Sequence, residues 1–112
     1  MDRVSLDMLG PATALVALSG EHELFGAPKL QEQIDTLIAD GASIVVDLTD
    51  AVFIDSSIVS VLLRSHRFAA SRGCDYTVVL GASTGDSIRR MFELTGLAGI
   101  LPVVERDGAL PN

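Results

Sequence analysis

The chain of 112 residues, 48% of them hydrophobic, is long enough to bury one hydrophobic core but too short for a second domain. Its formal charge of -7 argues against binding to nucleic acid or to an anionic membrane surface, because the phosphates of either would repel it. We therefore expect a single domain over residues 1–112 whose partner is a protein with a basic patch.

The first predicted elements are two strands joined by a tight turn. Val4–Met8 alternates apolar and polar residues, which is typical of a strand with one wet face, whereas Ala12–Leu18 is more continuously apolar. Gly10-Pro11 turns the chain between them, so the two form a hairpin. Gly20 is expected to end the second strand and Glu21–Glu23 to form a loop.

An amphipathic helix follows this loop. Pro28 is tolerated in a first turn because the N-H that it lacks would be unpaired there, which places the start near Gly26 or Ala27. Gly41 supplies the stop. The apolar residues recur on one face at helical spacing: Ala27, Leu30, Ile34, Leu37 and Ile38.

A third strand leads into the most distinctive stretch of the chain. Ser43–Leu48 is the predicted strand, and the absence of alternation in Ile44–Val46 predicts a strand covered on both sides. A short acidic connection over residues 49–54 comes next. Asp55–Ser57 then opens a strongly apolar helix that runs to about Arg72.

This second helix has two clear faces at 100° per residue. Val59 and Leu63 fall between them, and we weigh two alternatives equally: burial by a neighbouring helix, or exposure at a binding surface near Ser57. The polar face holds Ser60, Arg64, Arg67 and Ser71, and the inward face holds Ile58, Val61, Leu62, Ser65, Phe68 and Ala69.

The last third of the chain adds a strand, a helix and a short strand. Tyr76–Leu80 is rich in β-propensity, and a helix between two strands predicts a right-handed parallel crossover. Ser83 or Thr84 is expected to cap the third helix, which Gly96 stops. Ile100–Val104 is a candidate final strand.

The start of the second helix is the candidate functional site. Asp55 or a serine there accepts hydrogen bonds from the unpaired first N-H groups of the helix. A serine at the same place is also well placed to carry a phosphate, since free N-H groups and the helix dipole favour an anion. Both readings use the same atoms, and a simple cap is the commoner outcome.

The same residues resemble a known family, the STAS domain of bacterial anti-sigma factor antagonists. The buried strand, acidic connection, Asp55–Ser57 and apolar helix are similar to its central motif. Gly20–Glu23 resembles its Gly-Glu-Leu-Asp, and Arg90–Leu97 resembles its Arg-Leu-Phe-x-x-x-Gly-Leu. The resemblance implies an α/β STAS fold with a core over about residues 4–104, in which a four- to five-stranded mixed sheet is covered by about three helices. Residues 105–112 form a polar tail, too short for the family's further helix.

The resemblance also implies a function. Ser57 would be the phosphoacceptor, and the unphosphorylated protein would bind an anti-sigma factor that is also a serine kinase, thereby freeing a sigma factor. A serine phosphatase is a further candidate partner. The protein would then be a kinase substrate and binding module, not an enzyme. The implied partner-binding residues are Glu21, Glu23, Asp55, Ser56, Ser57, Val59 and Leu63.

One position departs from the family pattern. Ile58 stands where the family usually has glycine after the phosphoacceptor. Because isoleucine is β-branched, we expect it to crowd a kinase loop that approaches Ser57. If it prevents phosphorylation, the alternative is an accessory or scaffold subunit of a signalling or transport complex. A weaker alternative is binding of a small ligand or nucleotide at the same helix start.

Other candidates for chemistry are weak. His22 and His66 lack a Cys or carboxylate at metal-ligand spacing, and no phosphate-binding loop or nucleophile elbow occurs, so no metal, cofactor or catalytic site is expected. Cys74, the only cysteine, cannot form an internal disulfide, which fits a reducing compartment. Residues 1–4 show no secretory signal and no apolar run approaches the roughly 20 residues of a membrane span, so we expect a cytoplasmic protein.

Overall fold

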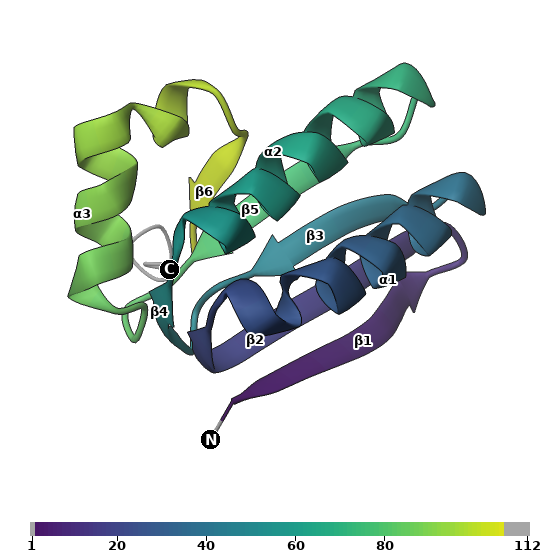
Figure 1. Cartoon of the computed structure of the whole chain (residues 1–112). Helices are drawn as coiled ribbons and strands as arrows, with labels where there is room; N and C mark the ends of the chain where they lie inside the picture. The colour runs from purple at the N-terminus through teal and green to yellow at the C-terminus, as the bar shows by residue number, and fades with distance from the viewer. Residues whose placement is uncertain (1, 107–112) are drawn as a thin grey trace.

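The computed structural model describes residues 2–106, and in this part of the chain three α-helices pack on a six-stranded mixed sheet (Figure 1). The polar tail was expected over residues 105–112, but Glu105 belongs to the last strand and Arg106 forms an ion pair with Asp47; residues 107–112 lie outside the described part. The strands are β1 (Arg3–Gly10), β2 (Thr13–His22), β3 (Ser43–Asp47), β4 (Ala51–Ile54), β5 (Tyr76–Leu80) and β6 (Val103–Glu105). The helices are α1 (Ala27–Ala39), α2 (Ser56–Ser71) and α3 (Asp86–Thr95), with single 3-10 turns η1 (Leu24–Gly26) and η2 (Leu97–Gly99).

The strand order explains why the sheet is mixed. It runs β1-β2-β3-β5-β6, with the β1–β2 hairpin antiparallel and the remaining neighbours parallel. The parallel pairs are joined through helices, as expected of crossover connections. The predicted hairpin, crossover and short final strand are confirmed. Parallel pairing also brings the carboxyl ends of β2, β3 and β5 to one end of the sheet.

A further strand, which no local sequence pattern indicates, lies at that end. Residues 51–54, taken above as part of an acidic connection, form β4, which pairs in parallel with the last three residues of β2. The expectation that Gly20 ends β2 was therefore wrong, because the strand continues to His22. Ala51 and Ile54 are fully buried, so β4 is fixed to the core at both ends. With β4 the sheet has six strands among the described residues, not the four to five expected.

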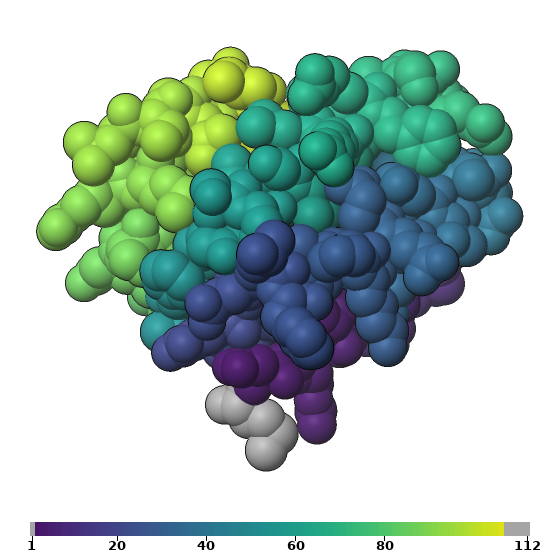
Figure 2. Space-filling model, in the orientation of Figure 1, coloured from purple at the N-terminus to yellow at the C-terminus, as the bar shows by residue number. Residues whose placement is uncertain are grey.

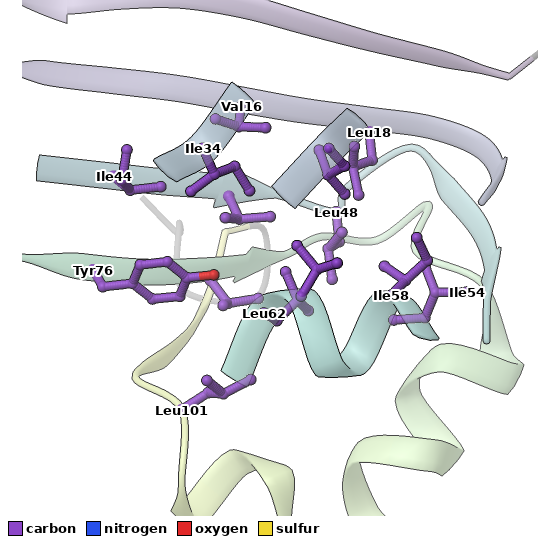
Figure 3. Close-up of a cluster of buried hydrophobic side chains, with 14 of the residues drawn as sticks. Val16, Leu18, Ile34, Ile44, Leu48, Ile54, Ile58, Leu62, Tyr76 and Leu101 are labelled. Atoms are coloured by element: carbon purple, nitrogen blue, oxygen red, sulfur yellow. The ribbon is translucent and has the colours of Figure 1, made fainter. Parts of the chain in front are cut away.

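The hydrophobic core lies between the sheet and the helices (Figure 3). The buried faces of α1 and α2 are those that helical spacing predicts, with Ile34, Ile38 and Leu62 fully buried. The prediction that β3 is covered on both sides was wrong. Ile44 and Val46 are buried but Val45 between them is only half-buried, because α1 and α2 lie over one face of the sheet (Figure 1).

The start of α3 also differs from the prediction. The residue that caps this helix is Gly85, which makes no side-chain cap hydrogen bond, and neither Ser83 nor Thr84 serves as the cap. The Thr84 hydroxyl is buried instead, where it accepts from the backbone N-H of Gly81 at 2.8 Å and donates to the carbonyl oxygen of Leu48 at 2.9 Å. A threonine that joins two buried loops is not available to cap a helix.

Candidate functional site

The candidate site is built around the carboxylate of Asp55, the N-cap of α2. One oxygen, Oδ1, accepts hydrogen bonds from the backbone N-H groups of Ser57 at 3.0 Å and Ile58 at 3.2 Å, and from the Ser57 hydroxyl. The other, Oδ2, accepts from the backbone N-H of Leu24 at 2.9 Å. Asp55 therefore satisfies the unpaired donors of the helix start and also fixes the 3-10 turn η1 beside it.

These hydrogen bonds stabilise the ionised form of Asp55. Donation by the Ser57 hydroxyl is the largest cause of a pKa below the ordinary 3.8 for this carboxyl. Partial desolvation opposes the shift, and the three backbone N-H groups add to it. Near neutral pH the site therefore carries a fixed negative charge next to the serine hydroxyl.

The two serines at the helix start have different surroundings. Ser57 is half-buried and its hydroxyl is oriented by Asp55, whereas Ser56 is exposed and its hydroxyl has no hydrogen-bond partner among residues 2–106. Because the Ser57 hydroxyl donates its proton to the Asp55 carboxylate, the lone pairs of its oxygen are not used in that hydrogen bond. The geometry therefore distinguishes Ser57 from Ser56, and Ser57 is also the serine that the family resemblance singles out.

Two acidic residues at the end of β2 and directly after it lie beside this helix start. The side chains of Glu21 and Glu23 are both exposed. Their backbone is held in place: Glu21 pairs with Phe53 of β4, and its N-H donates to the Asp2 carboxylate at 2.8 Å. The N-H of Asp55 donates to the carbonyl oxygen of His22 at 3.3 Å. Strand β4 thus joins the predicted acidic segment to the predicted phosphoacceptor.

A hollow of about 380 Å³ opens next to Ser57, between the start of α2 and the start of α1. A second hollow of about 700 Å³ continues along the two helices and shares Pro28, Gln31 and Arg64 with the first. Figure 2 shows the surfaces of α1 and α2 adjoining on this face of the molecule. The hollow beside the serine is lined by Leu24, Ala27, Pro28, Gln31, Ser57, Ser60, Val61 and Arg64.

The structure does not place every predicted site residue around this hollow. Val59 and Leu63 are half-buried, pack against the hydrophobic core and do not line it. At 100° per residue they lie on the flank of α2 away from Arg64 and Ser57. Sequence reasoning also missed residues that do line the hollow, above all Leu24, because an apolar residue in a loop carries no periodic signal.

The expectation that Ile58 crowds an approach to Ser57 was wrong. The Ile58 side chain is only 1% exposed and belongs to the buried cluster between α2 and the sheet (Figure 3). Consecutive residues of a helix point about 100° apart, so Ile58 faces inward when Ser57 faces the surface. The β-branched side chain therefore serves the core and leaves the serine open.

The remaining chemical candidates lie apart from this site. The Nε2 of His22 lies 2.8 Å from the Ser19 carbonyl oxygen, and the His66 ring packs against Tyr76 with centroids 5.5 Å apart. Cys74 is half-buried with a free thiol. Within residues 2–106, no cluster of three or more His, Cys, Asp or Glu side chains is arranged to hold a metal ion. No helix in that range has the length and apolar character that crossing a bilayer requires.

Comparison with known proteins gives consistent matches. The sequence model of the family described as "Mlab, STAS domain" matches residues 7–104. An anti-sigma-B factor antagonist from Listeria monocytogenes is 27% identical over 96 residues, which cover 85% of this chain and 82% of that protein. Its counterpart from Bacillus subtilis is 25% identical over 88 residues, covering 79% and 78%.

Solved structures show the same fold. The anti-sigma factor antagonist SpoIIAA in its unphosphorylated form superimposes with a TM-score of 0.78 at 23% identity, over 93% of this chain and 88% of that chain. An anti-sigma factor antagonist from Mycobacterium paratuberculosis gives 0.76 at 24% identity, over 92% and 85%. SpoIIAA in its phosphorylated form gives 0.74 at 22% identity, over 93% and 91%.

Proposed function

The chain belongs to the STAS domain family, and we propose that it is an anti-sigma factor antagonist switched by phosphorylation of Ser57. Unphosphorylated, it binds an anti-sigma factor that is also a serine kinase, and so frees a sigma factor for transcription. Phosphorylation by that partner ends binding, and a serine phosphatase resets the switch. The protein acts in this cycle as a kinase substrate and a binding module.

The observation that carries this proposal is the position of the Ser57 hydroxyl. It lies at the N-terminus of a 16-residue helix, half-exposed beside a hollow, with its proton held by Asp55. The exposed carboxylates of Glu21 and Glu23 stand on the neighbouring segment. The similarity to anti-sigma-B factor antagonists supports the class of partner. A basic patch on the partner would complement this acidic end of the sheet.

Phosphorylation would change this site in two ways. The Ser57 hydroxyl would lose the proton that it donates to Asp55, and the new phosphate would add a charge of about -1.5 to -2 beside that carboxylate. A tenfold loss of affinity needs only about 1.4 kcal/mol, and an unpaired charge covered by an interface costs more than that. One phosphate at this position should therefore lower the affinity by more than tenfold when the interface covers it.

The test is an affinity capture from native cytosol with the wild-type domain and a Ser57→Glu variant, followed by identification of the bound proteins. We expect wild type to recover an anti-sigma factor of the kinase type and Ser57→Glu to lose it. Incubating the recovered kinase with ATP should then phosphorylate wild type and Ser56→Ala, but not Ser57→Ala. If wild type and Ser57→Glu recover the same partners, Ser57 only supports the Asp55 cap at the helix start, and the accessory or scaffold alternative replaces the switch.

A further inference from the structure

Two large apolar side chains project into solvent beside the phosphoacceptor. Phe25 is 100% exposed and Leu24 is 69% exposed, and both belong to the 3-10 turn η1 between β2 and α1. Leu24 also lines the hollow next to Ser57. A fully exposed phenylalanine leaves its whole apolar surface in water, which is unfavourable for the isolated domain. A partner that covers this surface would recover that free energy.

The turn that presents these side chains is held in a defined conformation. The backbone N-H of Leu24 donates to Asp55 Oδ2 at 2.9 Å, and the N-H of Gly26 donates to the Glu23 carbonyl oxygen at 3.0 Å. Ala27, which follows directly, is 7% exposed and belongs to the hydrophobic core. Because the backbone is already ordered, a partner that binds these side chains loses little affinity to ordering the turn.

We propose that Leu24 and Phe25 are the apolar anchor through which the unphosphorylated domain binds its anti-sigma factor. This proposal rests on the proposed function, and it specifies which residues the partner must cover. Exposed aromatic side chains of this kind, when covered at the centre of an interface, carry a large share of the binding energy.

The charges around the anchor indicate what kind of partner surface would cover it. The exposed carboxylates of Glu21 and Glu23 precede it directly in the chain, and Asp55 lies beneath it. The chain as a whole carries a formal charge of -7. The occupant is therefore an apolar pocket on the anti-sigma factor that is rimmed by Lys or Arg side chains. The Asp55 carboxylate accepts hydrogen bonds from the backbone N-H of Leu24 and from the Ser57 hydroxyl, so the same side chain contacts both the anchor and the proposed phosphoacceptor.

The test compares binding of purified wild type, Phe25→Ala and Leu9→Ala to the anti-sigma factor that wild type captures. Leu9 is a matched control because it is also apolar and 58% exposed, but lies at the opposite end of the sheet near the β1–β2 turn. We expect Phe25→Ala to weaken binding by on the order of thirtyfold and Leu9→Ala to leave it within about twofold. Thermal unfolding of Phe25→Ala should match wild type, since the side chain contacts no core residue.

The possible outcomes distinguish failure of the anchor proposal from failure of the proposed function. If wild type binds the anti-sigma factor and Phe25→Ala binds equally well, the anchor is wrong while the proposed function stands. If wild type captures no anti-sigma factor, both fail. If light scattering shows a wild-type dimer that Phe25→Ala converts to a monomer, the occupant is a second copy of this chain, and the proposed pocket on the anti-sigma factor is overturned.

Discussion

The backbone N-H of Leu24 donates a 2.9 Å hydrogen bond to the carboxylate of Asp55, 31 residues further along the chain. The same carboxylate accepts from the backbone and the hydroxyl of Ser57. One side chain therefore orders the turn after β2 and the start of α2 together. A substitution at Asp55 should therefore change the structure at both places, although only the start of α2 carries Ser57, the proposed phosphoacceptor.

The first prediction concerns the pH dependence of the Asp55→Asn variant. Because hydrogen bonds lower the folded-state pKa of Asp55 below 3.8, the unfolded state binds this proton more tightly than the folded state. The stabilising contribution is thus fully present above the unfolded-state pKa and is lost as the pH falls through the lowered folded-state pKa. Wild type should be more stable than Asp55→Asn near neutral pH, and the difference should shrink on acidification below 3.8.

Urea unfolding of both proteins across this pH series measures the difference directly. Asp75→Asn provides a control, since Asp75 is exposed just before β5 and does not cap a helix. A stability difference between wild type and Asp55→Asn that stays constant on acidification would show that the ionised carboxylate does not stabilise the helix start.

The second prediction concerns Ile58, the residue that departs from the family pattern described in the sequence analysis. Because its side chain is 1% exposed within the core, Ile58→Ala should lower the free energy of unfolding by about 2–5 kcal/mol. The rate at which the partner kinase phosphorylates the folded protein should stay unchanged, since the removed atoms point away from Ser57. A faster reaction in Ile58→Ala under conditions where both proteins are folded would restore the crowding hypothesis.

The faces of α1 and α2 could be predicted from the sequence because helical spacing alone decides which side chains point inward. Val59 and Leu63 mark the limit of that reasoning. Their angles place them between the two faces, and only the packing of neighbouring elements decides that they are half-buried on the core. Position on a helix constrains direction, whereas burial depends on what lies opposite.

Strand β4 and the cap of α3 could not be predicted for a similar reason. Residues 51–54 are too few to show a period of their own, and they form a strand because the end of β2 offers an edge for pairing. Thr84 resembles a helix cap in sequence, but its hydroxyl bridges Gly81 and Leu48. In both cases a contact between segments distant in sequence overrides the local pattern.

In the candidate site, too, the local features could be predicted and the contacts between distant segments could not. A cap at Asp55 was predictable because cap chemistry operates within three residues of sequence, whereas Ser57 was singled out among its neighbours only by the family resemblance. The hydrogen bond from Leu24 to Asp55 joins two segments and has no local signature. The exposure of Phe25 was equally unpredictable. The sequence of a loop does not indicate whether its phenylalanine packs inward or, as here, is fully exposed.

The third prediction concerns the exposed carboxylate of Glu23. Replacing it with lysine should weaken binding to the anti-sigma factor by on the order of three- to tenfold at low ionic strength, mainly through slower association. Added salt should reduce the difference, because exposed charges are screened. Asp75→Lys makes the same change of charge just before β5, at the end of the sheet opposite to the candidate site, and should have little effect on binding. Equal affinities of Glu23→Lys and wild type at low salt would remove Glu23 from the interface.

The last prediction concerns the contact that holds α3 against β4. The N-H of Gly85 donates to the Ala51 carbonyl oxygen at 2.9 Å, and a Cβ atom at Gly85 would overlap the backbone carbonyl of Val52. Backbone atoms of a paired strand cannot move aside cheaply, so Gly85→Ala should lower the free energy of unfolding by about 1–3 kcal/mol.

Gly99 is the matched control for this substitution, because a Cβ there would meet nothing within 4 Å and its backbone needs no glycine. Gly99→Ala should change the free energy of unfolding by no more than about 0.5 kcal/mol. Since β4 also positions the end of β2, Gly85→Ala should weaken binding to the anti-sigma factor even at temperatures where the variant is fully folded. If Gly85→Ala has the same free energy of unfolding as wild type, β4 can shift to accommodate the added atom. The strand would then not hold the site rigidly.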